Sequence, residues 1–128
     1  MDNNASEIFC AMTLIKIGDR FLGVSRKDDH TDIGMPGGKS DPGESYADCA
    51  IRETMEETGY TVRLLDVPPY IAQGHNRTCV TFLAQIVPTA KRPLNKSETG
   101  LVGMFPKQAF IDGFSGEYNI HMFKHFGL

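Results

Sequence analysis

The sequence predicts an α/β protein in which a mixed β-sheet is flanked by helices. Short apolar, β-branched runs bounded by turn residues predominate, and only two segments have helical spacing. The 128 residues suffice for one domain with a single core, and the 41% hydrophobic and 23% charged residues are ordinary for a globular protein. We therefore expect a single domain over residues 1–128.

The strands are predicted from short apolar and β-branched runs. The first two runs flank Gly18 and Asp19, a pair typical of a tight turn, and so predict a β-hairpin. A later run has Val80, Phe82 and Ala84 at alternate positions, which would put them on one face of a strand. In chain order the expected strands are 8–17, 20–25, 61–65, 70–73, 78–87 and 101–105.

One helix is predicted between Ser45, whose hydroxyl can cap the first turn, and Gly59, which suits a left-handed helix end. Its apolar positions recur at helical spacing and are expected to pack on the core: Ala47, Ile51 and Met55, with Thr54 and Thr58 beside them. A second helix is predicted to close the chain. Its expected range is 117–126. The remaining segments are charged, Gly-rich or contain proline, and we expect them to be irregular: 26–32, 35–43 and 88–97.

Charge and cysteine content restrict the class of partner. The 13 basic and 16 acidic residues give a net charge of −3, which argues against a broad surface for double-stranded nucleic acid or an anionic membrane. A small molecule is therefore the expected partner, bound by a monomer or a homodimer. Residues 1–7 are polar and acidic, which predicts a disordered tail rather than a signal peptide. The three widely spaced cysteines suit reduced thiols and predict a cytoplasmic protein.

Three carboxylates lie together on the first predicted helix. Glu53, Glu56 and Glu57 have i, i+3 and i+4 spacing, so they share one face, and that face points away from the apolar stripe. Like charges at these spacings destabilise a helix by roughly 0.2–0.5 kcal/mol per pair, which a bound cation would offset. Carboxylate oxygens favour Mg²⁺, with Mn²⁺ as the other candidate, over zinc. The alternative is a solvated helix face without a metal.

A second phosphate-binding motif has to be considered at the entrance to this helix. Gly38, Lys39 and Ser40 resemble the end of a P-loop, which requires a glycine five positions earlier. That position is Ile33, and the segment that follows Ser40 contains Pro42 rather than running straight into a helix. We therefore reject the P-loop interpretation.

Residues 38–60 match the Nudix box, G-x5-E-x7-R-E-U-x-E-E-x-G-U, at all seven strictly specified positions. Thr54 and Tyr60 depart from it only where the motif asks for an aliphatic residue. The chain thus resembles the Nudix hydrolase superfamily, most closely its MutT-like branch, and the resemblance implies the Nudix fold, an α/β/α sandwich. The matching residues are Gly38, Glu44, Arg52, Glu53, Glu56, Glu57 and Gly59.

The resemblance also implies roles for particular residues. Glu53, Glu56 and Glu57 would bind the divalent metal together with the backbone carbonyl of Gly37, and Arg52 would hold a carboxylate of the box in place. Glu44 would orient the loop and helix rather than take part in the chemistry. Gly38 and Lys39 are candidate substrate contacts at the glycine-rich entrance. Glu98 is the candidate for an additional metal ligand or general base, with an exposed loop glutamate as the alternative.

The implied reaction is in-line attack by metal-activated water on a phosphorus atom of a diphosphate group. The MutT-like branch suggests a nucleoside triphosphate, including an oxidised one, which would give the monophosphate and pyrophosphate. In that branch an asparagine near the start of the last helix can recognise the purine, and Asn119 lies there; a helix cap is the other interpretation. ADP-ribose, nucleotide sugars and 5′-triphosphorylated RNA are alternative substrates, and a catalytically silent nucleotide sensor is the non-enzyme alternative.

Overall fold

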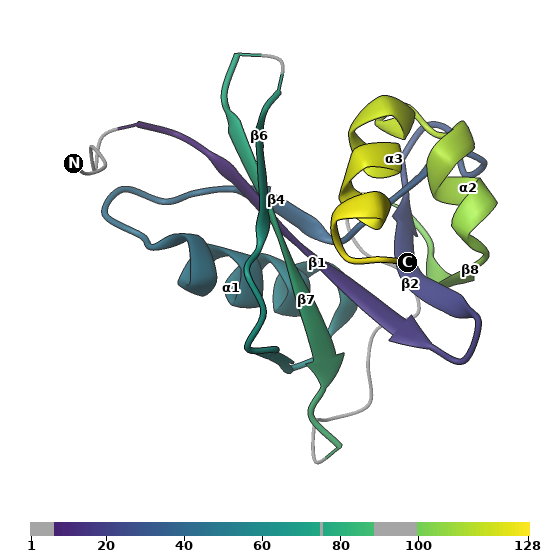
Figure 1. Ribbon diagram of the computed structural model, residues 1–128, viewed down its shortest axis with the longest axis horizontal. Helices are drawn as coiled ribbons and strands as arrows, with labels where there is room; N and C mark the ends of the chain where they lie inside the picture. The colour runs from purple at the N-terminus through teal and green to yellow at the C-terminus, as the bar shows by residue number, and fades with distance from the viewer. Residues whose placement is uncertain (1–6, 75, 89–99) are drawn as a thin grey trace.

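The computed structural model describes residues 7–74, 76–88 and 100–128, and these form a mixed β-sheet with helices packed on it (Figure 1). Strands β1 and β7 run parallel at the centre, and the other strand pairs are antiparallel. The strand order is β3-β2-β1-β7-β5, with β4 beside β1, β6 beside β7 and β8 beside β2. The strands are β1 (Cys10–Ile17), β2 (Arg20–Ser25), β3 (Ile33–Gly34), β4 (Gly37–Lys39), β5 (Val62–Leu64), β6 (Tyr70–Gln73), β7 (Thr78–Ile86) and β8 (Val102–Phe105).

The helices cover the two faces of the sheet. Helix α1 (Tyr46–Thr58) packs on one face, and α2 (Lys107–Asp112) and α3 (Gly116–His125) pack on the other (Figure 1). Alternate residues of β1 contact these two layers: Ala11 packs with Cys49 of α1, whereas Leu14 packs with Phe110 and Phe123 of α2 and α3. The predicted α/β class and the α/β/α arrangement are therefore confirmed. No helix in the described part of the chain is long and apolar enough to cross a membrane.

Helix α1 begins and ends where the sequence predicts. The Ser45 side chain accepts a hydrogen bond from the backbone N–H of Asp48 at 3.0 Å, which caps the first turn. Gly59 has a φ of 80° and donates its N–H to the carbonyl of Met55 at 2.8 Å. A residue with a side chain would be strained in this left-handed conformation, so the glycine fixes the end of the helix.

The predicted apolar stripe of α1 is wrong at Met55, whereas Ile51 packs partly buried on the core as predicted. The buried residues are small or hydroxylated, and Met55 of the predicted stripe is 40% exposed. Small side chains let the helix approach the sheet closely, and the buried hydroxyls are satisfied: Thr54 shares a 2.8 Å hydrogen bond with Thr13, and Thr58 donates to the Thr54 carbonyl at 2.7 Å. The helix is thereby turned so that Glu53 faces the sheet. The buried positions are Cys49, Ala50, Thr54 and Thr58.

The remaining differences lie in short elements. The structure contains α2, a six-residue helix that was not predicted, so the described residues hold three helices rather than two. The expected irregular segment 35–43 contributes β4, whose Gly37 pairs with Met12 of β1. A Cβ at Gly37 would meet the backbone of Met12 at 2.8 Å, so only glycine allows β4 to lie this close. Residues 1–6 of the predicted tail and most of the predicted loop 88–97 lie outside the described residues.

Candidate active site

Glu53 of α1 faces Gly38 of β4 at the edge of the sheet. A Cβ built on Gly38 would come within 2.6 Å of the Glu53 carboxyl carbon, so the carboxylate occupies the space that a side chain at position 38 would need. The Glu53 side chain is only 16% exposed. Gly38 therefore contributes to the site by having no side chain, which leaves room for the Glu53 carboxylate.

Arg52 connects most of the box carboxylates. Its guanidinium donates two hydrogen bonds to Glu44, at 2.8 and 3.0 Å, in a bidentate arrangement. The same group donates to Glu53 at 3.1 Å and to Glu56 at 3.1 Å. It also donates to the Lys39 carbonyl at 3.1 Å, which ties the helix to the glycine-rich segment. Arg52 thus holds three carboxylates and one backbone oxygen at fixed relative positions.

The ionisation of two of these carboxylates is shifted in opposite directions. The hydrogen bonds from Arg52 lower the pKa of Glu44, so this carboxylate stays charged well into the acidic range. Burial raises the pKa of Glu53, and the nearby Glu56 adds to the rise, although Arg52 opposes it. The charged form of Glu53 is therefore destabilised in this environment, and a bound cation would stabilise it.

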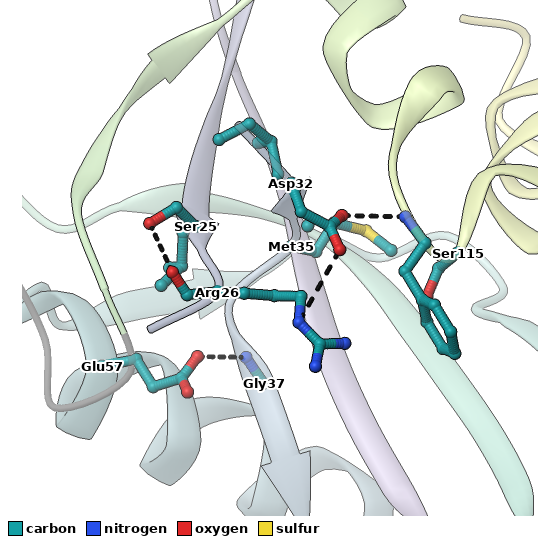
Figure 2. Close-up of a pocket in the computed structure, with 11 residues that line it drawn as sticks. Ser25, Arg26, Asp32, Met35, Gly37, Glu57 and Ser115 are labelled. Atoms are coloured by element: carbon teal, nitrogen blue, oxygen red, sulfur yellow. Dashed lines mark hydrogen bonds and ion pairs between the residues drawn. The ribbon is translucent and has the colours of Figure 1, made fainter. Parts of the chain in front are cut away.

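Glu57 lies one helical turn further along and points into a cavity. Its carboxylate accepts a hydrogen bond from the backbone N–H of Gly37 at 3.1 Å, as Figure 2 shows. The cavity has a volume of about 240 Å³. Asp32 and Arg26 form part of the same wall: their side chains are paired at 3.7 Å, and Asp32 accepts the backbone N–H of Phe114 at 2.8 Å (Figure 2).

The donor set suits a hard divalent cation. It consists of carboxylate oxygens of α1 and backbone carbonyl oxygens of the adjacent β4. Such oxygens are the ligands that Mg²⁺ and Mn²⁺ prefer. Within the described residues, no three His, Cys, Asp or Glu side chains converge on one point. Instead Arg52 bonds to Glu53 and Glu56, and Glu57 turns toward Gly37. The residues present thus fit a divalent metal by their chemistry, and these contacts would have to yield for it to bind.

A second, larger cavity of about 980 Å³ lies on the α3 face of the sheet. It shares part of its wall, including Met35 and Phe114, with the cavity that contains Glu57, so the two spaces adjoin. Ligand cavities typically measure about 300–1,000 Å³. Its wall combines apolar and aromatic side chains, such as Met12, Tyr70 and Tyr118, with a few polar groups. This space can hold a group of nucleoside size beside the cavity that Glu57 borders.

Within the part of the chain that the structure describes, two buried polar atoms of residues that line the larger cavity have no hydrogen-bond partner. Asn119 is fully buried, and its amide nitrogen donates to the Phe110 carbonyl at 3.0 Å while its Oδ1 is unpaired. Nη1 of Arg77 is likewise buried and unpaired. Unsatisfied buried groups are rare in folded proteins, and a bound ligand is one explanation for them. Asn119 is therefore neither the exposed cap nor the turn residue that sequence reasoning allowed as its alternative.

Two predicted site residues remain, Lys39 and Glu98. The Lys39 side chain is exposed and lines neither cavity, although its carbonyl accepts from Arg52. Glu98 lies outside the described residues. For Asp32, sequence reasoning favoured a solvated loop and kept a substrate contact as the alternative; it did not single out Tyr118. Asp32 ends a charged loop that appeared solvated, and nothing in the pattern around Tyr118 distinguishes a cavity wall from a buried helix face.

Residues 9–117 match the family model described as the NUDIX domain. Together with the fold and the acidic helix, this match shows that the chain belongs to the Nudix family. It is a hydrolase of a family that generally uses a divalent metal. The predicted resemblance to Nudix hydrolases is confirmed.

Three similar proteins illustrate the range of the family. An Ap4A hydrolase of C. elegans superposes with a TM-score of 0.74 at 19% identity, over 94% of this chain and 96% of that one. An ADP-ribose pyrophosphatase of Streptococcus suis 89-1591 gives a TM-score of 0.69 at 21% identity, over 93% and 88%. A protein of Bacillus subtilis (strain 168) named "Putative 8-oxo-dGTP diphosphatase" is 57% identical over 30 residues. That match spans 23% of this chain and 20% of the length of the curated relative.

Proposed function

We propose that this protein hydrolyses a nucleoside triphosphate, with a preference for an oxidised purine, to the monophosphate and pyrophosphate in the presence of Mg²⁺. The observation that carries the proposal is the position of Glu57. Its carboxylate borders a cavity that adjoins the larger one, where the unpaired atoms of Asn119 and Arg77 lie. A nucleotide with its phosphates at the acidic helix would thus have its base at these two polar groups.

Glu53, Glu56 and Glu57 would hold the metal, with the Gly37 carbonyl as a further oxygen ligand and Mn²⁺ as an alternative ion. The metal would supply charge neutralisation at the phosphate oxygens and lower the pKa of a bound water. Arg52 positions the carboxylates through the contacts described above. Glu98 remains the proposed additional ligand or base.

The preference for an oxidised purine follows from the amide of Asn119. Its nitrogen is already bonded to the Phe110 carbonyl, so the unpaired atom of the amide is an acceptor. Arg77 offers a donor. Oxidation of guanine at C8 adds a carbonyl oxygen there and converts N7 from an acceptor into an N–H donor. The oxidised base therefore has one more donor with which to pair Asn119. The similarity to the B. subtilis protein supports the same choice.

The proposal is tested by steady-state hydrolysis with Mg²⁺. The panel comprises 8-oxo-dGTP, dGTP, dATP, ADP-ribose, a nucleotide sugar and a short 5′-triphosphorylated RNA. We expect the highest kcat/KM for 8-oxo-dGTP, with pyrophosphate as the second product. A higher kcat/KM for ADP-ribose, a nucleotide sugar or the RNA would reject the proposed substrate class. No Mg²⁺-dependent product from any compound would favour the silent sensor.

The role of Asn119 is tested by Asn119→Asp and Arg77→Met. A site that hydrogen-bonds a substrate group discriminates strongly against an analogue that lacks the group. We expect Arg77→Met to lower kcat/KM for both guanine nucleotides. Asn119→Asp keeps an acceptor but sets its second oxygen against the Phe110 carbonyl, so its Tm should fall. Asn119→Leu removes the acceptor and should abolish the preference for the oxidised base. Equal preference in Asn119→Leu and the wild type would remove Asn119 from base recognition.

A further inference from the structure

Cys10 and Cys79 lie opposite one another on the two central strands of the sheet. They are register partners in the parallel β1–β7 pair. Neighbouring strands are about 4.7–4.9 Å apart, which falls within the Cα separation of roughly 4.4–6.8 Å that a disulfide can span. Register partners point to the same face, and both residues line the larger cavity. The backbone therefore holds the two cysteines at a bridging separation, accessible from the cavity.

The two thiols already interact with each other and are separated from the third cysteine. Burial raises the pKa of the Cys79 thiol, and the interaction with the Cys10 thiol raises it further. A Cβ at Gly74 would come within 2.8 Å of the Cys79 sulfur, so this glycine leaves the sulfur its space. Cys49 lies on the buried face of α1, and its thiol donates to the Gly38 carbonyl at 3.6 Å. It packs with Ala11, a β1 residue on the face that contacts α1.

We propose that Cys10 and Cys79 form an oxidation-sensitive dithiol in the wall of the nucleotide cavity, which a hydroperoxide converts into an intramolecular disulfide. The Cys10 sulfur attacks one peroxide oxygen, the O–O bond breaks, and water leaves, which gives a sulfenic acid. The Cys79 sulfur then attacks the Cys10 sulfur, the S–S bond forms, and the S–O bond breaks. The hydroxide takes the Cys79 proton and leaves as water. Two thiols and one hydroperoxide thus give one disulfide and two waters when the oxidant is H₂O₂.

The disulfide would change the cavity and leave the acidic helix in place. The sulfur atoms would approach to about 2.0 Å, and the bond would fix β1 to β7 beneath the space assigned to the nucleoside. Glu53 and Glu57 belong to α1 and do not line the larger cavity. The bridge should therefore raise KM for the nucleotide several-fold and change kcat little. This part of the inference rests on the proposed function, which places the nucleoside in that cavity.

Formation of the bridge is tested without nucleotide or metal. Purified wild-type protein is treated with H₂O₂ and analysed by intact mass and peptide mapping. We expect a loss of two hydrogens and a single linked peptide pair that contains Cys10 and Cys79. Cys49→Ala is the matched control and should form the same bridge, whereas Cys10→Ala should not lose two hydrogens. Sulfinic acid without a bridge, a bridge to Cys49 or a disulfide-linked dimer would overturn the proposal.

The effect on the cavity is tested by kinetics on the best nucleotide of the panel. KM of the oxidised wild type should rise and return to the reduced value after dithiothreitol, while KM of Cys10→Ala should not respond to peroxide. An unchanged KM in fully bridged protein would refute the effect on the cavity. The two proposals fail separately, because a reduced protein that hydrolyses no nucleotide would overturn the function, whereas the mass measurement alone decides whether the bridge forms.

Discussion

Replacement of Gly38 by alanine tests whether the glycine-rich segment positions the carboxylate of Glu53. The added Cβ would lie 2.6 Å from the Glu53 carboxyl carbon, whereas ordinary van der Waals contact begins at 3.4 Å. Oε1 of Glu53 would lie closer still, so the carboxylate would have to move by roughly 1 Å. A misplacement of about 1 Å at an active site can cost ~10²-fold in rate, so we expect kcat to fall by ~10–100-fold.

The assay is Mg²⁺-dependent nucleotide hydrolysis, together with the Mg²⁺-induced rise in Tm. Gly103→Ala is the matched control, because a Cβ there meets only the ring of Phe105 at an ordinary 3.4 Å. We expect this control to keep wild-type kcat and the wild-type response to Mg²⁺. If Gly38→Ala folds and keeps kcat within twofold of the control, the steric argument is refuted.

Three further predictions concern stability. Because burial raises the pKa of Glu53, its ionisation destabilises the fold at a pH above its native pKa. This destabilisation is absent at a pH below the pKa of the glutamate in the unfolded chain. Glu53→Gln should therefore raise the Tm of the metal-free protein near pH 7 and remove most of the stabilisation by Mg²⁺; a lower metal-free Tm would contradict this. Arg52 lowers the pKa of Glu44 below about 4.5, the value expected in the unfolded chain. The ion pair therefore stabilises the fold above that pH, and this stabilisation is lost as the pH falls through the native pKa. Arg52→Lys should make the fall in Tm between about pH 5 and pH 3 shallower, and an unchanged pH profile would exclude this linkage. Thr13→Val should cost about 1–3 kcal/mol by leaving the Thr54 hydroxyl without its 2.8 Å partner, and adding Thr54→Val should recover part of that loss in urea unfolding, whereas simple additivity would count against a buried pair.

The boundaries of α1 could be predicted because the residues at its two ends set them. Ser45 and Gly59 act through their own hydrogen bond and φ angle, so their effect is visible in the sequence. The buried face of the helix could not be predicted in the same way. The predicted stripe contained Met55 with Thr54 beside it, but only Thr54 is buried, because a small side chain with a satisfied hydroxyl allows close packing. Tertiary contact therefore decided which side of the helix Glu53 occupies.

The acidic site could be predicted as a group of residues but not as an arrangement. The spacing of Glu53, Glu56 and Glu57 put them on one helix, yet the helix rotation leaves the Glu53 side chain 16% exposed and the Glu56 side chain 57% exposed. The environment of Asn119 depends on the Phe110 carbonyl in a helix that has only six residues and was not predicted. Contacts of this kind between distant segments leave no periodic signal in the chain.

The most direct test of the account is a crystal structure with Mn²⁺ and a non-hydrolysable analogue of the preferred nucleotide, in which anomalous scattering locates the metal. We predict a Mn²⁺ ion bonded to carboxylate oxygens of Glu53 and Glu57 and to a phosphate oxygen of the analogue, with the Glu57 contact to Gly37 N–H broken. An analogue bound with its phosphates away from α1, and no ion in contact with either glutamate, would contradict the central claim.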